Sequence, residues 1–258
     1  SFFILRTFED LDTVPQNELS LIQFPTRELF EEELGSFDLV VLMNFEYGPY
    51  GIGPYLENLR RYVYEGGALA MVGGDQAFSS GNYFGTPLAE ALPVELFVPG
   101  WMRQSGGASA DDPLVSTEEF SPQLTEEGRH HPVTRLRFED RENQARWQSL
   151  PKLEGVNLVG GAKAGATVLL THPFLKTQDS GPLPVLTVAG YGSGRSLALI
   201  TDTSWRWGFW AAGKAGDDGR AYQQFWENAM RWLIRDPELE YLQVESSRSV
   251  YAPGDAPD

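Results

Sequence analysis

The stretch from Phe37 to Asp75, FDLVVLMNFEYGPYGIGPYLENLRRYVYEGGALAMVGGD, decides the fold that the sequence predicts. Its first apolar run, Phe37 to Met43, is nearly continuous, as a strand buried on both faces requires. A helix is predicted from Pro54 to Tyr64, and a pair of glycines ends it. A second apolar strand follows from Ala68 to Val72. Two strands joined through a helix by short links predict a right-handed crossover between parallel strands.

The same kinds of element recur on both sides of this stretch. They are listed here by residue range: strands at Phe2–Arg6, Glu18–Phe24, Ala166–Thr171, Pro184–Ala189 and Arg195–Thr201, and helices at Thr86–Leu92, Asp140–Ser149 and Arg220–Arg235. A tight glycine turn between the last two strands predicts a hairpin. Glycine-rich loops are expected at Gly100–Asp112 and Gly213–Gly219. We therefore expect an α/β fold whose mostly parallel, flavodoxin-like open sheet is flanked by helices, with an irregular middle insertion and a C-terminal β-hairpin.

Composition excludes several classes of function. The formal net charge is -16 and the pI is about 4.6, so the surface repels phosphate backbones and is unsuited to an anionic leaflet. We expect no nucleic-acid partner and no direct membrane insertion, because no apolar run approaches the length of a transmembrane helix. The chain has no cysteine, which excludes disulfides, thiolate metal sites and cysteine nucleophiles.

The two ends of the sequence suggest a piece of a longer protein. The chain begins abruptly on the apolar run Ser1 to Leu5, and natural N-termini rarely begin inside a core strand. Near the other end, an extended run from Tyr241 to Val244 precedes Pro253-Gly254-Asp255, a pattern that often opens a β-sandwich module. We expect one domain over residues 1–240 and a linker to a further module over residues 241–258.

Three parts of the sequence resemble a known family. They are ELSLIQFPTRELFEEELGSFDLVVLMN (18–44), YVYEGGALAMVGGDQAFSSGNYFGTPLAEALPVEL (62–96), and GYGSGRSLALITDTSWRW (190–207) with the following AYQQFWENAMRWLIRDPE (221–238). Together they are similar to class I glutamine amidotransferase-like domains of large bacterial membrane-anchored proteins, which often also carry von Willebrand factor A modules. The resemblance implies a further strand and helix before Ser1, and a location in the cell envelope outside the cytoplasm.

The resemblance also locates the expected reaction centre. Active members of the wider class place a Cys at a strand-to-helix elbow and activate it with a His and a Glu from a later segment. In this sequence the nucleophile position falls at or next to Gly73, and the partner segment, Asp202 to Trp207, contains no His-x-Glu pair. Ser79 and Ser80 lie near the elbow but not in a G-x-S-x-G pattern, so we expect them to form a turn.

Polar and aromatic side chains nevertheless gather where a ligand crevice is expected. Open α/β sheets bind ligands beyond the carboxyl ends of their parallel strands. The candidate crevice residues are Asn44, Glu46, Gly73, Gly74, Asp75, Trp205, Arg206 and Trp207. Simpler interpretations are that the polar members cap turns and that the aromatic ones pack over a vacant site.

Three histidines complete the set of candidate groups. His130 and His131 are adjacent and point in different directions, so a metal site there would need carboxylates from elsewhere. His172 ends a strand and is a weak candidate for a general base, as are Asp75 and His131 for a non-cysteine site. We expect no metal and no cofactor.

Two classes of function follow from these observations. The leading hypothesis is a non-catalytic domain that binds a small molecule or a protein partner within a larger envelope protein. The rival is a hydrolase or lyase with an Asp/His site, with or without a metal. The rival requires at least two titratable groups within hydrogen-bond reach of one another.

Overall fold

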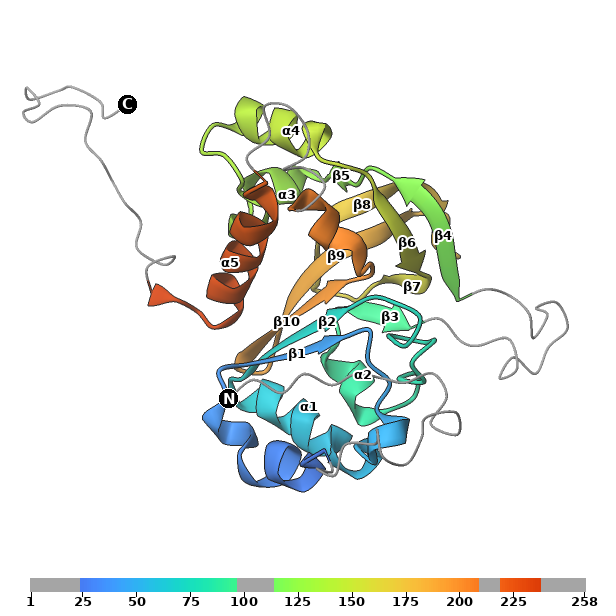
Figure 1. The fold of residues 1–258 in the computed structure, drawn as a ribbon, viewed down its shortest axis with the longest axis vertical. Coiled ribbons are helices and arrows are strands. Elements are labelled where there is room, and N and C mark those ends of the chain that lie inside the picture. Colours follow the sequence, from blue (N-terminus) through green and yellow to red (C-terminus); the bar gives the residue numbers. More distant parts are fainter. Residues whose placement is uncertain (1–23, 97–113, 209–218, 238–258) are drawn as a thin grey trace, which may run out of the picture.

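A computed structural model describes residues 24–96, 114–208 and 219–237. Its centre is a six-stranded sheet in the order β1-β2-β10-β9-β8-β5 (Figure 1). The strands are β1 (Leu39–Met43), β2 (Ala68–Val72), β5 (Gln123–Leu124), β8 (Thr167–Lys176), β9 (Pro182–Tyr191) and β10 (Gly194–Leu199). The chain is therefore a mixed α/β fold.

The parallel part of the sheet is the part that the opening stretch predicted. β1 runs parallel to β2, and β2 runs parallel to β10. The link from β1 to β2 contains α1 (Leu56–Glu65), which buries Leu56, Leu59 and Val63. Helix α1 ends at Gly66, whose φ of 133° suits a residue without a Cβ. The predicted parallel pairing of two strands joined through a helix is confirmed.

The expectation of a mostly parallel sheet is wrong for the other strands. The pairings β10–β9, β9–β8 and β8–β5 are all antiparallel. For β8–β9 and β9–β10 the physical reason is the length of the connections, because residues 177–181 and 192–193 are too few for a crossover between parallel strands. The same shortness confirms the predicted hairpin, which turns at Gly192 with a φ of 58°.

β1 also differs from the prediction that both of its faces are buried. Val41 and Met43 are 43% and 47% exposed, whereas Leu42 is buried. Among the described strands β1 pairs with β2 alone. A continuous apolar run does not reveal whether a strand lies at the centre of a sheet or at its edge.

Two short ribbons and several helices surround the sheet. The ribbons are β3 (Val94–Leu96) with β7 (Val159–Ala162), and β4 (Val115–Phe120) with β6 (Leu153–Asn157). The remaining α-helices are α2 (Pro87–Ala91), α3 (Glu126–His130), α4 (Asp140–Ser149) and α5 (Ala221–Leu233). The irregular helical turns are η1 (Glu28–Glu32), η2 (Leu34–Ser36), η3 (Gly48–Tyr50), η4 (Gly53–Tyr55), η6 (Pro132–Thr134) and η7 (Thr203–Trp207). The predicted helix at Asp140–Ser149 is confirmed at both ends.

Helices cover the sheet from two sides. Helices α1 and α2 lie on one side, and α5 lies on the other (Figure 1). Beneath α5 an aromatic cluster joins three elements: the rings of Trp147 and Trp207 are 5.2 Å apart, and those of Trp207 and Phe225 are 5.3 Å apart. Both pairs meet edge to face, the geometry that the ring quadrupoles favour. This cluster binds the middle region to the C-terminal helix.

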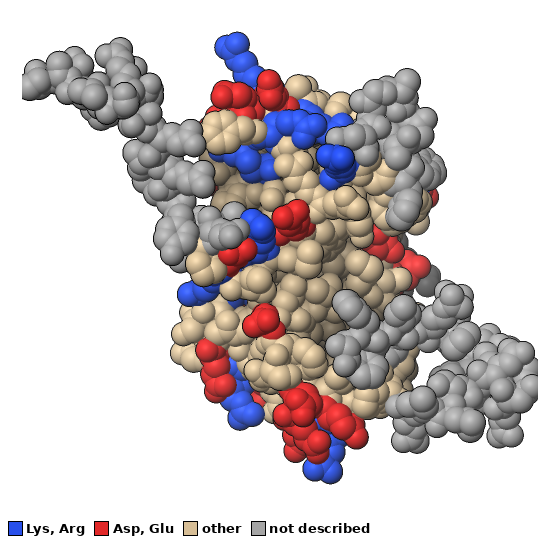
Figure 2. Space-filling model, turned by 60° about the vertical axis from the view of Figure 1, so that its left-hand side comes forward, with Lys and Arg blue, Asp and Glu red and all other residues tan. Residues whose placement is uncertain are grey.

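Charge is distributed unevenly over the surface. In Figure 2, blue side chains gather at the end built by α3 and α4, and red ones dominate the opposite end near η1 and α1. Ion pairs offset part of the basic end, since Arg129 lies 3.1 Å from Glu126 and Arg135 contacts Asp140.

Several predictions lie outside the described residues. They are the strand at Phe2–Arg6, the run at Glu18–Phe24 except Phe24, the loops at Gly100–Asp112 and Gly213–Gly219 except Gly219, and the division between residues 240 and 241. Within the part of the chain that the structure describes, no helix has the length and apolar character needed to cross a bilayer.

Candidate functional site

The elbow after β2 has no space for a nucleophilic side chain. The N–H of Gly73 donates to the carbonyl of Leu199 at 2.8 Å, which draws the elbow against the end of β10. A Cβ placed on Gly73 would lie 2.5 Å from the carbonyl carbon of Ile200 and 2.6 Å from the nitrogen of Thr201. Both neighbours are backbone atoms, so they cannot rotate away. Glycine at this position is required by packing as well as being chemically inert.

Gly74, the next residue, also has no space for a side chain. Its φ is 124°, a conformation that side chains rarely adopt, and a Cβ there would collide with the amide of Asn44. Asn44 itself has a φ of 42°, and its Oδ1 accepts a hydrogen bond from the N–H of Gln76 at 2.8 Å. Asn44 therefore holds the turn after the elbow and does not project into a crevice.

Asn157, which was not among the predicted crevice residues, completes the elbow. It is buried at the end of β6, and its Oδ1 accepts from the N–H of Gly74 at 2.9 Å. Its Nδ2 donates to the carbonyl of Gly74 at 2.9 Å and lies 3.0 Å from the hydroxyl of Ser80. One carboxamide thus satisfies both backbone groups of Gly74. In the sequence, Asn157 only ends the mixed run LEGVN, which does not indicate this role.

A pocket of about 320 Å³ opens beside the elbow. Its walls are the elbow, the β4–β6 ribbon and the segment that runs from β10 into η7. The lining residues are Gly74, Asp75, Val115, Thr117, Glu154, Gly155, Val156, Asn157, Ile200, Asp202, Thr203, Trp205 and Arg206. Of the predicted crevice residues, Gly74, Asp75, Trp205 and Arg206 line this pocket.

The pocket carries acidic groups close to one another. Burial raises the pKa of Asp202, and the nearby charge of Asp75 raises it further. Glu154 lines the same pocket with its side chain about half exposed. A half-buried carboxyl whose pKa is raised beside a second acidic side chain favours either a retained proton or a bound cation. Trp205, with 38% of its surface exposed, adds an aromatic face to the rim.

The sequence matches a model of a known protein family. A model of the GATase1-like family, described as "Putative glutamine amidotransferase", matches residues 33–235. The chain belongs to this family. No curated protein matches the sequence.

Solved structures share the fold of this GATase1-like domain. Cytoplasmic Protein STM3548 from Salmonella typhimurium is 22% identical with a TM-score of 0.53, over 78% of this chain and 74% of that one. Cytoplasmic Protein STM1381 from Salmonella typhimurium LT2 is 21% identical, also with a TM-score of 0.53, over the same shares of the two chains. At this level of identity the likeness concerns the fold alone.

Other predicted crevice residues of the GATase1-like domain lie elsewhere. Glu46 accepts a hydrogen bond from the side-chain amide of Asn82 at 2.7 Å on the exposed surface. Trp207 is fully buried in the aromatic cluster beneath α5. Adjacent residues of η7 therefore have different roles, because the helical turn directs Trp205 and Arg206 to the pocket and Trp207 to the core.

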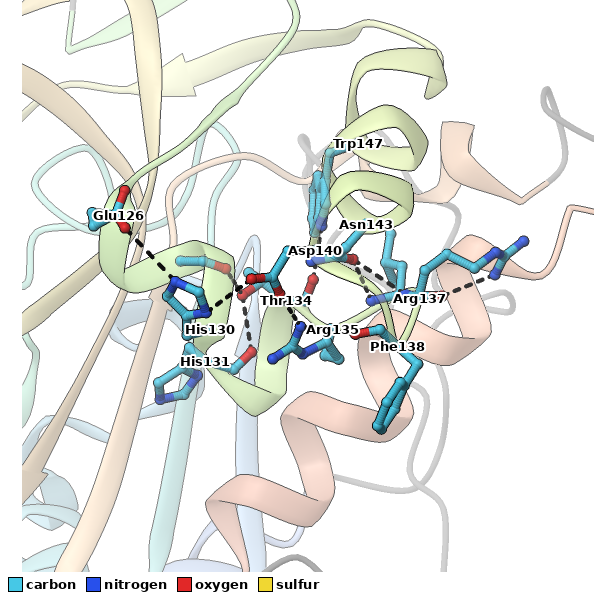
Figure 3. Close-up of polar contacts among 12 residues, drawn as sticks. Glu126, His130, His131, Thr134, Arg135, Arg137, Phe138, Asp140, Asn143 and Trp147 are labelled. Carbon is cyan, nitrogen blue, oxygen red and sulfur yellow. Dashed lines mark hydrogen bonds and ion pairs between the residues drawn. The ribbon is translucent and has the colours of Figure 1, made fainter. Parts of the chain in front are cut away.

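His131 packs on α5 and not in the pocket. Its ring meets Trp232 edge to face with 5.3 Å between centroids, and its Nδ1 accepts from the N–H of Val133. Burial and, to a smaller extent, the charge of Arg195 lower the pKa of His131 to about 4. Figure 3 shows its neighbour His130 between Glu126 and Asp140, which lie 3.7 and 3.5 Å from its ring nitrogens.

His172 belongs to β8, and its ring packs against aromatic side chains. Its ring centroid is 4.3 Å from that of Phe120, and its Nδ1 accepts from the N–H of Leu175 at 2.9 Å. Burial lowers the pKa of His172. Neither this residue nor His131 lines the pocket that contains Asp75. Across the described ranges, no group of three His, Asp or Glu side chains is arranged to hold a metal ion.

Proposed function

We propose that this GATase1-like domain is non-catalytic and binds a small, positively charged ligand in the pocket beside the elbow. The observation that carries the proposal is the packing of Gly73, where even a methyl group would meet the backbone of Ile200 and Thr201. A cysteine-dependent amidotransferase needs a nucleophile at this point. The chain has no cysteine, and the elbow has no space for one.

The lining of the pocket supports a cationic ligand. Asp75, Asp202 and Glu154 line it, and Glu154 is also paired with Arg206. Burial is the main cause of the raised pKa of Asp202 and the charge of Asp75 adds to it; a bound ammonium or amidinium group would offset this added repulsion. Trp205 at the rim has a ring that already lies 5.9 Å from the guanidinium carbon of Arg206, so it is a ring that accepts a cation. An anionic ligand would be repelled by the carboxylates of Asp75 and Asp202.

The first experiment tests the absence of catalysis. Purified protein is incubated with glutamine, with and without divalent metals, and released glutamate is measured. We expect no release above that of an Asp75→Ala variant. Release that requires Asp75 would overturn the proposal and support the rival hydrolase, which would then use the carboxylates of the pocket.

The second experiment tests the ligand class with three molecules of nearly equal size. Benzamidine is cationic, benzamide is neutral and benzoate is anionic, so their dissociation constants separate charge from shape. We expect benzamidine to bind most tightly, and Asp202→Asn to weaken it about tenfold, the effect of one contact worth roughly 1.4 kcal/mol. The matched control is Asp179→Asn, which changes an exposed aspartate that does not line the pocket. Equal binding of all three probes would contradict the proposal.

We further propose that the domain acts within a larger envelope protein. This part rests on the resemblance of residues 18–44, 62–96, 190–207 and 221–238 to domains of membrane-anchored bacterial proteins. The test is the location of the full-length parent protein after cell fractionation.

A further inference from the structure

Arg206 places a buried cation at the wall of the pocket. Its side chain is 8% exposed. Its Nη1 lies 2.9 Å from Oε1 of Glu119, and its Nη2 is hydrogen-bonded to Oε2 of Glu154. Glu119 belongs to β4 and Glu154 to β6, so one guanidinium contacts both strands of the ribbon.

Arg206 needs a compensating charge more than the two carboxylates do, because only Arg206 is buried. Removing a guanidinium from water is costly unless opposite charges compensate it within the protein. Glu119 and Glu154 are 53% and 47% exposed and would remain hydrated without the pair. The observed position of the ribbon, which we call closed, is therefore favoured because it places both carboxylates against the charge of Arg206.

The backbone of β6 has further attachments to the body of the domain, one of them at Glu154 itself. The N–H of Asn157 donates to the carbonyl of Ile200 at 2.8 Å, and the N–H of Glu154 donates to the hydroxyl of Thr203 at 2.9 Å. Both contacts involve β6. The register between β4 and β6 shifts between Ser116 and Glu119, which interrupts the ladder next to Thr117 in the pocket wall. Beyond that shift, Arg206 provides a side-chain contact from the body of the domain to β4.

We propose that Arg206 is a positioning residue that holds the β4–β6 ribbon closed and so sets the width of the pocket. Its charge is committed to Glu119 and Glu154, and its role toward the ligand is to place Thr117 and Glu154. This inference rests on the proposed function for the identity of the pocket, but the position of the ribbon can be measured without any ligand.

The ligand-free test is amide hydrogen exchange on the whole chain. In Arg206→Met we expect exchange at residues 115–120 to become about tenfold faster or more, because local opening there loses its main ion pairs. Exchange in β9 and β10 should not change. The control is Arg27→Met, which removes an exposed arginine paired with Glu31 and Glu32. Unchanged exchange in the ribbon would overturn the proposal.

Binding of benzamidine provides a second test with opposite signs for the two possible roles. Arg206→Met makes the pocket more negative, so a purely electrostatic role predicts tighter binding of the cation. A positioning role predicts binding weakened about tenfold, and tighter binding would overturn it.

Glu119→Gln keeps the proposal testable if Arg206→Met does not fold. This variant removes a partner of Arg206 that does not line the pocket. Faster exchange in the ribbon is expected, and exchange equal to that of the wild type would overturn the proposal. Should wild-type protein bind no benzamidine, the proposed function fails, while the exchange experiment still decides the role of Arg206.

Discussion

The side-chain amide of Asn157 bonds both backbone groups of Gly74, each at 2.9 Å. Asn157 ends β6, far along the chain from the elbow, and its side chain also lies within hydrogen-bond distance of Ala77 and Ser80. This pair of bonds therefore fixes the backbone of the elbow to a distant strand.

Removing this amide should destabilise the fold. Asn157→Ala leaves the N–H of half-buried Gly74 without its partner, while the carbonyl of Gly74 keeps a hydrogen bond from the N–H of Ala77. We expect the free energy of unfolding to fall by about 1–3 kcal/mol, the cost of one unsatisfied buried polar group. Chemical denaturation measures the change. Asn58→Ala, which removes one bond to the carbonyl of Phe30, is the control and should cost less. Equal losses would contradict the role given to Asn157.

A methyl group at Gly73 should also be poorly tolerated. Gly73→Ala forces a Cβ against the backbone of Ile200 and Thr201, so we expect a loss of about 2–3 kcal/mol or more. The matched variant is Gly35→Ala, because a Cβ at Gly35 would meet nothing within 4 Å. That substitution should change the unfolding free energy by less than about 1 kcal/mol. A stable Gly73→Ala protein would show that the elbow can open, and would weaken the case against catalysis.

His131 should make the protein less stable in mild acid. Its pKa is about 4 in the folded protein, mainly because of burial, and near 6.5 in an unfolded chain. The unfolded state therefore binds the proton more readily. The contribution to stability is fully present above about pH 6.5 and declines as the pH falls toward 4.

The measurement is the unfolding free energy at pH 7 and at pH 4.5. Carboxylates also titrate in this window, so the informative quantity is the difference between wild type and His131→Phe. We expect the wild type to lose on the order of 2 kcal/mol more than the variant. The exposed His130, changed to Gln, serves as the control, and a variant that loses as much stability as the wild type would refute the prediction.

Replacing Asp202 should raise the stability of the protein and weaken the binding of a cationic ligand. Its raised pKa means that the folded protein holds the proton more tightly than the unfolded chain, so the ionised form at neutral pH disfavours folding. Asp202→Asn should therefore raise the melting temperature at pH 7 while it weakens the binding of benzamidine. At a pH below the ordinary pKa of an aspartate the stabilising effect should disappear. Lower stability of the variant at pH 7 would show that the carboxylate has a structural partner.

Local patterns predicted the elements well. The strand at Ala68–Val72 and the helix at Asp140–Ser149 were predicted at both boundaries, since apolar runs and turn residues are properties of neighbouring positions. The family, too, could be recognised from the sequence, because its motifs are short and contiguous. The glycine turn predicted that β9 and β10 are antiparallel, but the antiparallel pairings of β8 were not predicted, since an apolar strand has the same pattern in a parallel or an antiparallel pair.

The sequence by itself determined that this protein has no cysteine nucleophile, and that a glycine pair ends the strand where one would stand. Only the tertiary structure decided that Gly73 and Gly74 are packed against Asn157, Asn44 and the end of β10, that Asp75 and Asp202 share a pocket, and that His131 and His172 lie outside it. The physical reason is range: composition and periodicity depend on residues close together in the chain, whereas a pocket is made by side chains that only the packing of distant strands brings into contact.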